Sequence, residues 1–198
     1  AQRGPPVLPD SARARYREGM TVPLAELLAE PLTEDDLDEV DRALRGTGIH
    51  YELDEGRLIL MSPMKSWHAD VSARVRNLLV AQGRIAYQEQ GMRLSHRRVR
   101  FPDVAAFRAH PHPDAGRHDP ADVTLVVEVI SVDSEYEDRV TKANLYADAG
   151  IPEYWVVDRR PGAERDAVIE FFRLGPGGGY QRTGEAVLSD LEQRYGTR

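Results

Sequence analysis

The most constraining feature of this 198-residue chain is an almost unbroken run of β-branched residues at positions 123–130, VTLVVEVI. Such a run suits a central strand that is covered on both faces, so it predicts a sheet with helices packed against it. Glu128 is the one charged residue inside the run. Because a buried carboxylate is costly without compensation, we expect Glu128 to have a cationic, metal or hydrogen-bonding partner.

Periodicity and turn signals predict further helices and strands on both sides of this run. Residues 1–32 contain five prolines and are predicted to form an arm, followed by a single domain over 33–198. The elements expected before the run are a helix at 34–45, a hairpin at 49–61, a helix at 67–82, strands at 84–89, 92–95 and 100–107, and a loop at 110–120. Those expected after it are a helix from Ser134 to about 148, a strand at 154–157 and a C-terminal β-hairpin at 168–174 and 180–183. The predicted fold class is α/β, a mixed sheet flanked by helices.

Composition excludes several classes of protein. The chain has no cysteine, so zinc fingers, disulfide frameworks and thiol nucleophiles are excluded together. No apolar run approaches the roughly 20 residues of a membrane span, and the first ten residues lack the order of a signal peptide. We therefore expect a cytoplasmic protein without membrane attachment. The net charge of −7 leaves no broad basic surface for duplex DNA, so any contact with nucleic acid must be local.

Two acidic residues on neighbouring predicted strands are the best candidates for chemistry. Asp103 follows Pro102, and it could converge with Glu128 to form a hard-oxygen cage that prefers Mg²⁺ or Mn²⁺. The backbone carbonyl of Val129 could add a third oxygen, and Lys142 on the next helix could orient water or stabilise charge on a phosphate. Each residue also has a structural interpretation: a Pro-Asp turn, a half-exposed strand end, and a lysine paired on the helix surface with Asp138.

Several spaced segments resemble one known family. They are YELDEGRLILMSP at 51–63, FPDVAAF at 101–107, VTLVVEVIS at 123–131 and DRVTKANLYADAGIPEYWVVD at 138–158, together with His68. They resemble the Uma2 family of predicted restriction endonucleases, a branch of the PD-(D/E)XK nuclease superfamily. The resemblance covers roughly residues 34–160. It implies a restriction-endonuclease-like core, a divalent-metal site and hydrolysis of phosphodiester bonds in DNA.

The resemblance also implies roles for individual residues. It makes Asp103 the aspartate of the PD motif and Glu128 the acidic residue of the third core strand. The superfamily lysine would fall at position 130, where this chain has Ile130, and Lys142 takes the place of the lysine on the following helix. Glu52 and His68 also match family positions and are expected to support the site or handle a proton. The alternative for His68 is a histidine at a helix start that its neighbours satisfy.

An arginine cluster precedes Asp103 in the sequence. Arg93, Arg97, Arg98 and Arg100 could bind backbone phosphates beside the cleavage site, because arginine suits bidentate phosphate binding. The alternative is a solvated turn that balances local acids. A homodimer is expected, since cleavage of both strands of a duplex takes two sites. No organic cofactor is expected.

Other patterns carry weaker signals. His110, His112, Asp114 and His118 lie in a proline-punctuated loop without the regular spacing of a metal site. The glycines at 177–179 lack a following Lys-Ser/Thr, so they indicate a hairpin turn rather than a phosphate loop. No Gly-x-Ser-x-Gly motif occurs. The alternative to a nuclease is a nuclease-fold protein without useful activity that acts as a DNA-binding or interaction module.

Overall fold

The computed structural model describes residues 30–61, 63–131 and 136–197. Most of the predicted arm therefore lies outside the described residues, and so does Ser134. The chain divides into two compact units. The smaller unit comprises the described residues up to Pro63 together with Ser95–Val99, and the larger one comprises Met64–Leu94 and the described residues from Arg100 onward.

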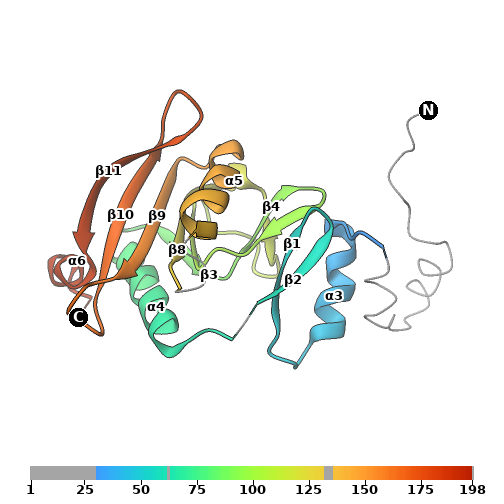
Figure 1. The fold of residues 1–198 in the computed structure, drawn as a ribbon, viewed down its shortest axis with the longest axis horizontal. Helices are drawn as coiled ribbons and strands as arrows, with labels where there is room; N and C mark the ends of the chain where they lie inside the picture. Colours follow the sequence, from blue (N-terminus) through green and yellow to red (C-terminus); the bar gives the residue numbers. More distant parts are fainter. Residues whose placement is uncertain (1–29, 62, 132–135, 198) are drawn as a thin grey trace. The chain divides into compact units, whose positions relative to one another are not determined.

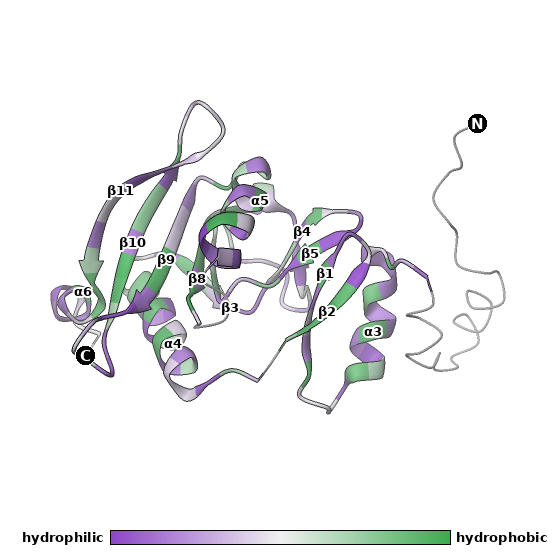
Figure 2. Cartoon of the chain, in the orientation of Figure 1, coloured by the Kyte–Doolittle hydropathy of each residue, from purple (hydrophilic) through white to green (hydrophobic). Residues whose placement is uncertain are grey.

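The smaller unit begins with a short helix. A 3₁₀ turn, η1 (Glu34–Asp36), leads into α3 (Leu37–Leu44), which confirms the predicted helix. The backbone N–H and the hydroxyl of Thr33 both donate to Asp36 Oδ2, at 2.8 and 2.7 Å, so the first turn is capped. The apolar stripe of α3 is buried, and green and purple segments alternate along this helix in Figure 2.

A tight β-hairpin completes the smaller unit. Strands β1 (His50–Asp54) and β2 (Arg57–Met61) pair antiparallel around a two-residue turn, as predicted. The turn residues Glu55 and Gly56 have φ of 48° and 81°, as hairpin turns of this length require. A Cβ at Gly56 would also lie 3.0 Å from the backbone carbonyl of Leu32, so this turn favours glycine. Strand β5 (Arg98–Arg100) joins β1 through the pair Leu53 and Val99.

The larger unit is built on a six-stranded mixed sheet. Its strands are β3 (Ile85–Gln88), β6 (Val104–Phe107), β8 (Val123–Val129), β9 (Glu153–Arg159), β10 (Ala167–Leu174) and β11 (Tyr180–Val187). They lie in the order β11-β10-β9-β8-β6-β3. Only the β8–β9 pair among them is parallel, and the remaining pairs are antiparallel. The run at 123–130 thus forms a central strand, which confirms the α/β prediction.

Helices cover both faces of this sheet (Figure 1). On one face, α4 (Ser66–Ala81) and α6 (Leu188–Tyr195) pack on a core that includes Val127 and Trp155. On the other, a π-helical segment, η3 (Glu137–Lys142), runs into α5 (Ala143–Asp148) above a core that includes Val126 and Tyr154. Because β8 has cores on both sides, its apolar residues need no alternation.

The structure corrects several predicted elements. The single strand predicted at 100–107 is wrong, because Pro102 cannot donate a ladder hydrogen bond and β6 starts only at Val104. The predicted loop at 110–120 contains a short strand, β7 (Arg117–His118), which pairs with β4 (Gly91–Ser95) and precedes the turn η2 (Pro120–Asp122). The last strand extends to Val187, and α6 after it was not predicted. Among the described residues, no helix has the length and apolarity needed to cross a membrane.

Candidate active site

Asp103 lies at the point where the chain enters β6. Strands β6 and β8 are antiparallel neighbours with Val104 opposite Val127, so Asp103 comes next to the end of β8. Its Oδ2 accepts a 2.6 Å hydrogen bond from the backbone N–H of Val129. The Nε2 of His68, in the first turn of α4, lies 3.2 Å from the same oxygen. The Asp103 carboxylate is therefore fixed by one strand and one helix.

Glu128 lies inside the apolar β8 strand and is only 2 % exposed. Its carboxylate has the partners that its burial demands. Lys142 Nζ lies 3.2 Å from Oε2, and the Tyr146 hydroxyl donates to Oε1 at 2.8 Å. Both partners belong to the η3–α5 segment, so this helix supplies the compensation for the charge on the strand.

Lys142 is held between two carboxylates. Its Nζ lies 3.2 Å from Asp138 Oδ1 as well as from Glu128, and Lys142 is only 6 % exposed. Asp138 is 2 % exposed, so its pairing with Lys142 is buried and the interpretation as a helix-surface pair is wrong. Both residues lie in the π-helical segment, a rare geometry that often accompanies functional sites.

Two buried tyrosines contact the two carboxylate residues that flank Lys142. The Tyr154 hydroxyl donates a 2.6 Å hydrogen bond to the backbone carbonyl of Asp138, which anchors the π-helical turn to β9. The rings of Tyr146 and Tyr154 lie 5.8 Å apart. Burial, together with the nearby charges of Glu128 and Asp138, raises the pKa of Tyr154 well above its ordinary value. Tyr154 therefore acts as a fixed hydrogen-bond donor.

His68 contacts the site through Asp103. Burial alone would lower the pKa of His68, but the hydrogen bond to Asp103 and the negative charge of that carboxylate raise it overall. This histidine is better able to hold a proton than an exposed one, and it is in contact with an acid of the site. Because its partner Asp103 lies outside α4, His68 differs from the alternative of a helix-start histidine that its own neighbours satisfy.

Glu52 belongs to the smaller unit. It is buried on β1, opposite Ile59 of β2. Its predicted role beside Asp103 stays a prediction.

The four arginines have different surroundings. Arg93 is exposed on β4. Arg98 Nε lies 2.7 Å from Asp54 Oδ1 and its guanidinium lies 2.6 Å from Glu55, while Arg97 donates to the carbonyl of Glu55 at 2.9 Å. These contacts favour the alternative of a charge-balanced turn for Arg97 and Arg98.

Arg100 differs from the other three because it is only 1 % exposed. Its guanidinium lies 3.6 Å from Glu137 at the start of η3. A side chain buried to this degree presents little surface to a phosphate, and the ion pair with Glu137 connects Arg100 to the start of η3. Arg93 is the arginine of the set that is exposed.

The donor set near Asp103 and Glu128 consists of hard oxygens. Among residues 30–61, 63–131 and 136–197, no group of three or more His, Asp or Glu side chains is placed to hold a metal ion. The candidate ligands are therefore two carboxylates from adjacent strands and the carbonyl of Val129. This chemistry fits Mg²⁺ or Mn²⁺, which commonly use one or two carboxylates and complete their shell with water.

The histidines of the 110–118 loop have separate partners. His110 Nδ1 lies 2.9 Å from the Tyr87 hydroxyl, and His118 Nε2 lies 3.0 Å from Gln90 Oε1. His112 is exposed and approaches Asp114 only at 4.0 Å. They form no shared ligand set.

Comparison with known proteins identifies the family and the fold of the chain. Residues 36–193 match the model of the Uma2 family, which is described as "Putative restriction endonuclease". The chain belongs to the Uma2 family. A solved structure from Anabaena variabilis ATCC 29413, titled a "putative nuclease belonging to DUF820", is similar to it, with a TM-score of 0.52 and 16 % identity over 79 % of this chain and 84 % of that chain. The likeness confirms the predicted nuclease-like fold. No curated protein matches the chain.

Proposed function

We propose that this Uma2 protein is a metal-dependent endonuclease that hydrolyses phosphodiester bonds in DNA. The observation that carries the proposal is the buried ammonium of Lys142. It belongs to a π-helical turn and lies 3.2 Å from Glu128 on β8, the strand whose Val129 N–H also binds Asp103. The superfamily position for this lysine is occupied by Ile130, which is 6 % exposed and packs in the core. Lys142 thus supplies from the helix the positive charge that the strand lacks.

Asp103, Glu128 and the Val129 carbonyl would hold Mg²⁺ or Mn²⁺. When bound, the metal supplies a Lewis acid that lowers the pKa of coordinated water and neutralises charge on the phosphate. The protein orients the two acids in different ways. Asp103 is held by the Val129 N–H and by His68, whereas Glu128 is held by Lys142 and Tyr146.

Lys142 would act on the reacting groups directly. An ammonium shared by two carboxylates stays in place when Glu128 takes another partner, because Asp138 still holds it. From that position Lys142 would orient the attacking water or balance charge on the phosphate. His68 would accept or return a proton at Nε2 through its contact with Asp103.

We further propose that Arg93 contacts backbone phosphate and that two copies act together. The exposed guanidinium of Arg93 suits a phosphate, whose binding must be local on a chain with a net charge of −7. Two copies would provide one site for each strand of a duplex. Light scattering after size exclusion should give twice the 22.2 kDa chain mass. A particle of single-chain mass would contradict the dimer.

The nuclease proposal is tested by cleavage of labelled duplex and single-stranded DNA at low salt with Mg²⁺, Mn²⁺ or EDTA. We expect metal-dependent cleavage by the wild type and none by Asp103→Asn. The matched control is Asp70→Asn, which neutralises an aspartate on α4 whose side chain is 60 % exposed. This control should cleave like the wild type.

Metal binding gives a second readout that does not depend on substrate choice. Millimolar Mg²⁺ should raise the melting temperature of the wild type and of Asp70→Asn but not that of Asp103→Asn, since a ligand stabilises only the state that binds it. No cleavage on any substrate, with a melting temperature indifferent to both metals, would contradict the proposal and favour a DNA-binding module without activity.

A further inference from the structure

A cavity of about 270 Å³ lies in the larger unit, beneath the η3–α5 segment. It is lined by Arg139, Ala143, Asn144, Tyr154, Val156, Phe172 and Tyr180. These residues come from the helical segment and from β9, β10 and β11, so the cavity lies between one helix layer and the sheet. Its volume is just below that of pockets for drug-sized ligands, about 300–1,000 Å³, which suits a single ring system.

Aromatic rings form one side of the cavity. Tyr154 and Tyr180 stack with centroids 5.3 Å apart and an interplanar angle of 20°, and Phe172 lies 6.4 Å from Tyr154. Both hydroxyls are already engaged: Tyr154 donates to the Asp138 carbonyl and Tyr180 donates to the Ile151 carbonyl at 2.8 Å. The tyrosine rings are therefore fixed in advance. Tyr154 is only 1 % exposed, so another ring would stack on the partly exposed Tyr180 and Phe172, and their fixed support lowers the entropic cost of that stacking.

The charges at the cavity favour a neutral ring over a phosphate. Arg139 is the cation of the lining, and it pairs with both Glu170 and Asp158. Two carboxylates therefore neutralise its charge before any ligand arrives. Asn144 is exposed, and its amide offers both a donor and an acceptor, as the edge of a nucleobase requires.

The cavity adjoins the proposed cleavage site. Val156 in its wall is the β9 residue paired with Glu128 on β8. Tyr154 in its wall anchors the carbonyl of Asp138. Ala143 directly follows Lys142 in the chain. A ring in this cavity would thus lie next to the residues that we place at the reacting phosphate.

We propose that this cavity receives one unstacked nucleobase of the nucleic-acid strand that the site cleaves. The inference rests on the proposed function, because it takes the strand to pass Glu128 and Lys142. Stacking of bases on aromatic side chains tolerates every base, since each has a π-face. The cavity would hold the strand by one base and set the position of the neighbouring phosphate without reading sequence.

The chain offers a matched pair of variants on one strand. Phe172 lines the cavity, whereas its neighbour Phe171 packs against Trp155 in the core of the opposite face, with ring centroids 4.8 Å apart. Phe172→Ala and Phe171→Ala therefore remove the same ring from the same strand on opposite sides of the sheet. Thermal unfolding of both variants reports how much of each is folded at the temperature of the binding experiment.

The test is fluorescence anisotropy of a labelled 12-residue oligothymidylate and of an abasic strand of the same length, in EDTA at low salt. We expect the wild type to bind the base-bearing strand more tightly, Phe172→Ala to weaken it about tenfold, and Phe171→Ala to change it less than about twofold. The control Asp70→Asn, whose side chain is 60 % exposed on α4, should bind like the wild type. Because binding is measured in EDTA without any cleavage, a failed nuclease proposal leaves this result intact. Equal binding of the two strands by the wild type would overturn the inference, as would equal losses in the two phenylalanine variants.

Ala143→Met gives an independent check if Phe172→Ala does not fold. The longer side chain would fill the cavity from the helix side without removing any aromatic ring. We expect it to weaken binding of the base-bearing strand to the level of the abasic strand. Unchanged preference for bases in this variant would overturn the inference.

Discussion

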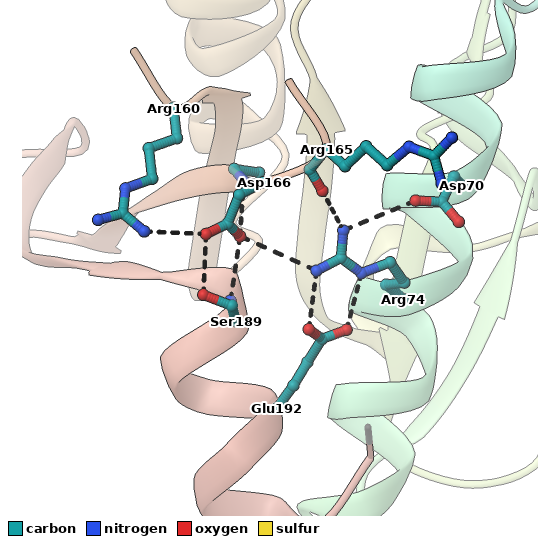
Figure 3. Close-up of polar contacts among 8 residues, drawn as sticks. Asp70, Arg74, Arg160, Arg165, Asp166, Ser189 and Glu192 are labelled. Carbon is teal, nitrogen blue, oxygen red and sulfur yellow. Dashed lines mark hydrogen bonds and ion pairs between the residues drawn. The ribbon is translucent and has the colours of Figure 1, made fainter. Parts of the chain in front are cut away.

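Two ionic clusters lie in the larger unit, on elements that cover opposite faces of the same sheet. One joins α4 to α6 through Arg74 and Glu192 (Figure 3), and the other joins β8 to η3 through Glu128 and Lys142. Both contain carboxylates that are about 3 % exposed at the side chain. They differ in the cation and in how closely its N–H groups are matched to individual acceptors.

The Arg74 cluster directs each donor to its own acceptor. Arg74 Nε and Nη2 donate to the two oxygens of Glu192 at 2.8 and 2.7 Å, and Nη1 donates to the carbonyl of Arg165 at 2.6 Å. The hydrogen bond from Arg74 to Glu192 raises the pKa of Arg74. Asp166 beside them accepts from the backbone N–H and hydroxyl of Ser189, which satisfies the start of α6. This geometry is a bidentate clamp between helices.

The Lys142 cluster instead shares one compact ammonium between two acids. Neither distance, 3.2 Å to Glu128 and 3.2 Å to Asp138, is as short as those around Arg74. An ammonium has no fixed fork and can turn toward a third partner, which a bidentate guanidinium cannot do without losing its acceptors. The comparison teaches that the two buried clusters differ in geometry: one fixes two helices, and the other has the adjustable cation that our proposed function requires.

The largest effect on stability is expected at Lys142. Lys142→Met keeps the volume of the side chain but leaves Glu128 and Asp138 buried without their shared cation, so the free energy of unfolding should fall by about 3–5 kcal/mol. Urea denaturation at neutral pH measures this loss. Adding Glu128→Gln to the variant should restore part of the stability, and a loss below about 1 kcal/mol would show that water compensates the acids.

A smaller loss is expected from the clamp. Glu192→Gln removes the charge but keeps one acceptor for Arg74, so the free energy of unfolding should fall by about 1.5–3 kcal/mol. Cleavage of DNA per folded molecule should not change, because the clamp lies on the face of the sheet away from Lys142. A specific loss of cleavage in Glu192→Gln, measured well below its melting temperature, would contradict this division of tasks.

Asp166 gives the clamp a dependence on pH. Burial alone would raise the pKa of Asp166, but hydrogen bonds from the Ser189 hydroxyl, the Ala167 N–H and Arg160 lower it below its ordinary 3.8. A lowered pKa means that the stabilisation is fully present above 3.8 and is lost as pH falls through the folded value. The difference in stability between wild type and Asp166→Asn, about 1 kcal/mol at neutral pH, should therefore shrink on acidification. A constant difference down to about pH 2 would contradict the assignment.

The smallest effect is expected at the rim of the clamp. Asp70 lies 3.6 Å from Arg74 and its side chain is 60 % exposed, so water screens the pair. Asp70→Asn should change the free energy of unfolding by less than about 0.5 kcal/mol in a urea titration. A larger loss would show that the clamp extends to the surface of α4.

The sequence predicts the elements of the site better than their pairing. The β-branched run identifies the central strand, Pro102 marks the turn before Asp103, and the helix periodicity at 67–82 places His68 at a helix start. These signals are local, and each depends on a few neighbouring residues. The residues alone made Lys142 a candidate on the next helix, and the family resemblance added support for it, because no local pattern brings a helix lysine to a strand glutamate.

The features that the sequence did not predict depend on tertiary packing. The π-helical turn forms where the Tyr154 hydroxyl on β9 donates a hydrogen bond to the carbonyl of Asp138, 16 positions earlier in the chain. Arg74 meets Glu192 across 118 positions. The sequence did contain a signal for α6, because Leu188 and Leu191 are three residues apart and a glycine follows at position 196. In the structure, Gly196 ends the helix with φ of 68°. No sequence signal indicated the burial of Asp138, because its spacing from Lys142 is the same as that of a pair on a helix surface.

The most direct test exchanges the two cations. We would measure single-turnover cleavage of DNA in Mg²⁺ by Lys142→Arg and Arg74→Lys, each well below its melting temperature. Lys142→Arg keeps the charge but not the compact ammonium, so cleavage should fall by about 10²-fold or more, while Arg74→Lys should lower stability and leave the cleavage rate within about twofold of the wild type. Equal rates for Lys142→Arg and the wild type would show that Lys142 is a structural cation like Arg74 and would contradict the account.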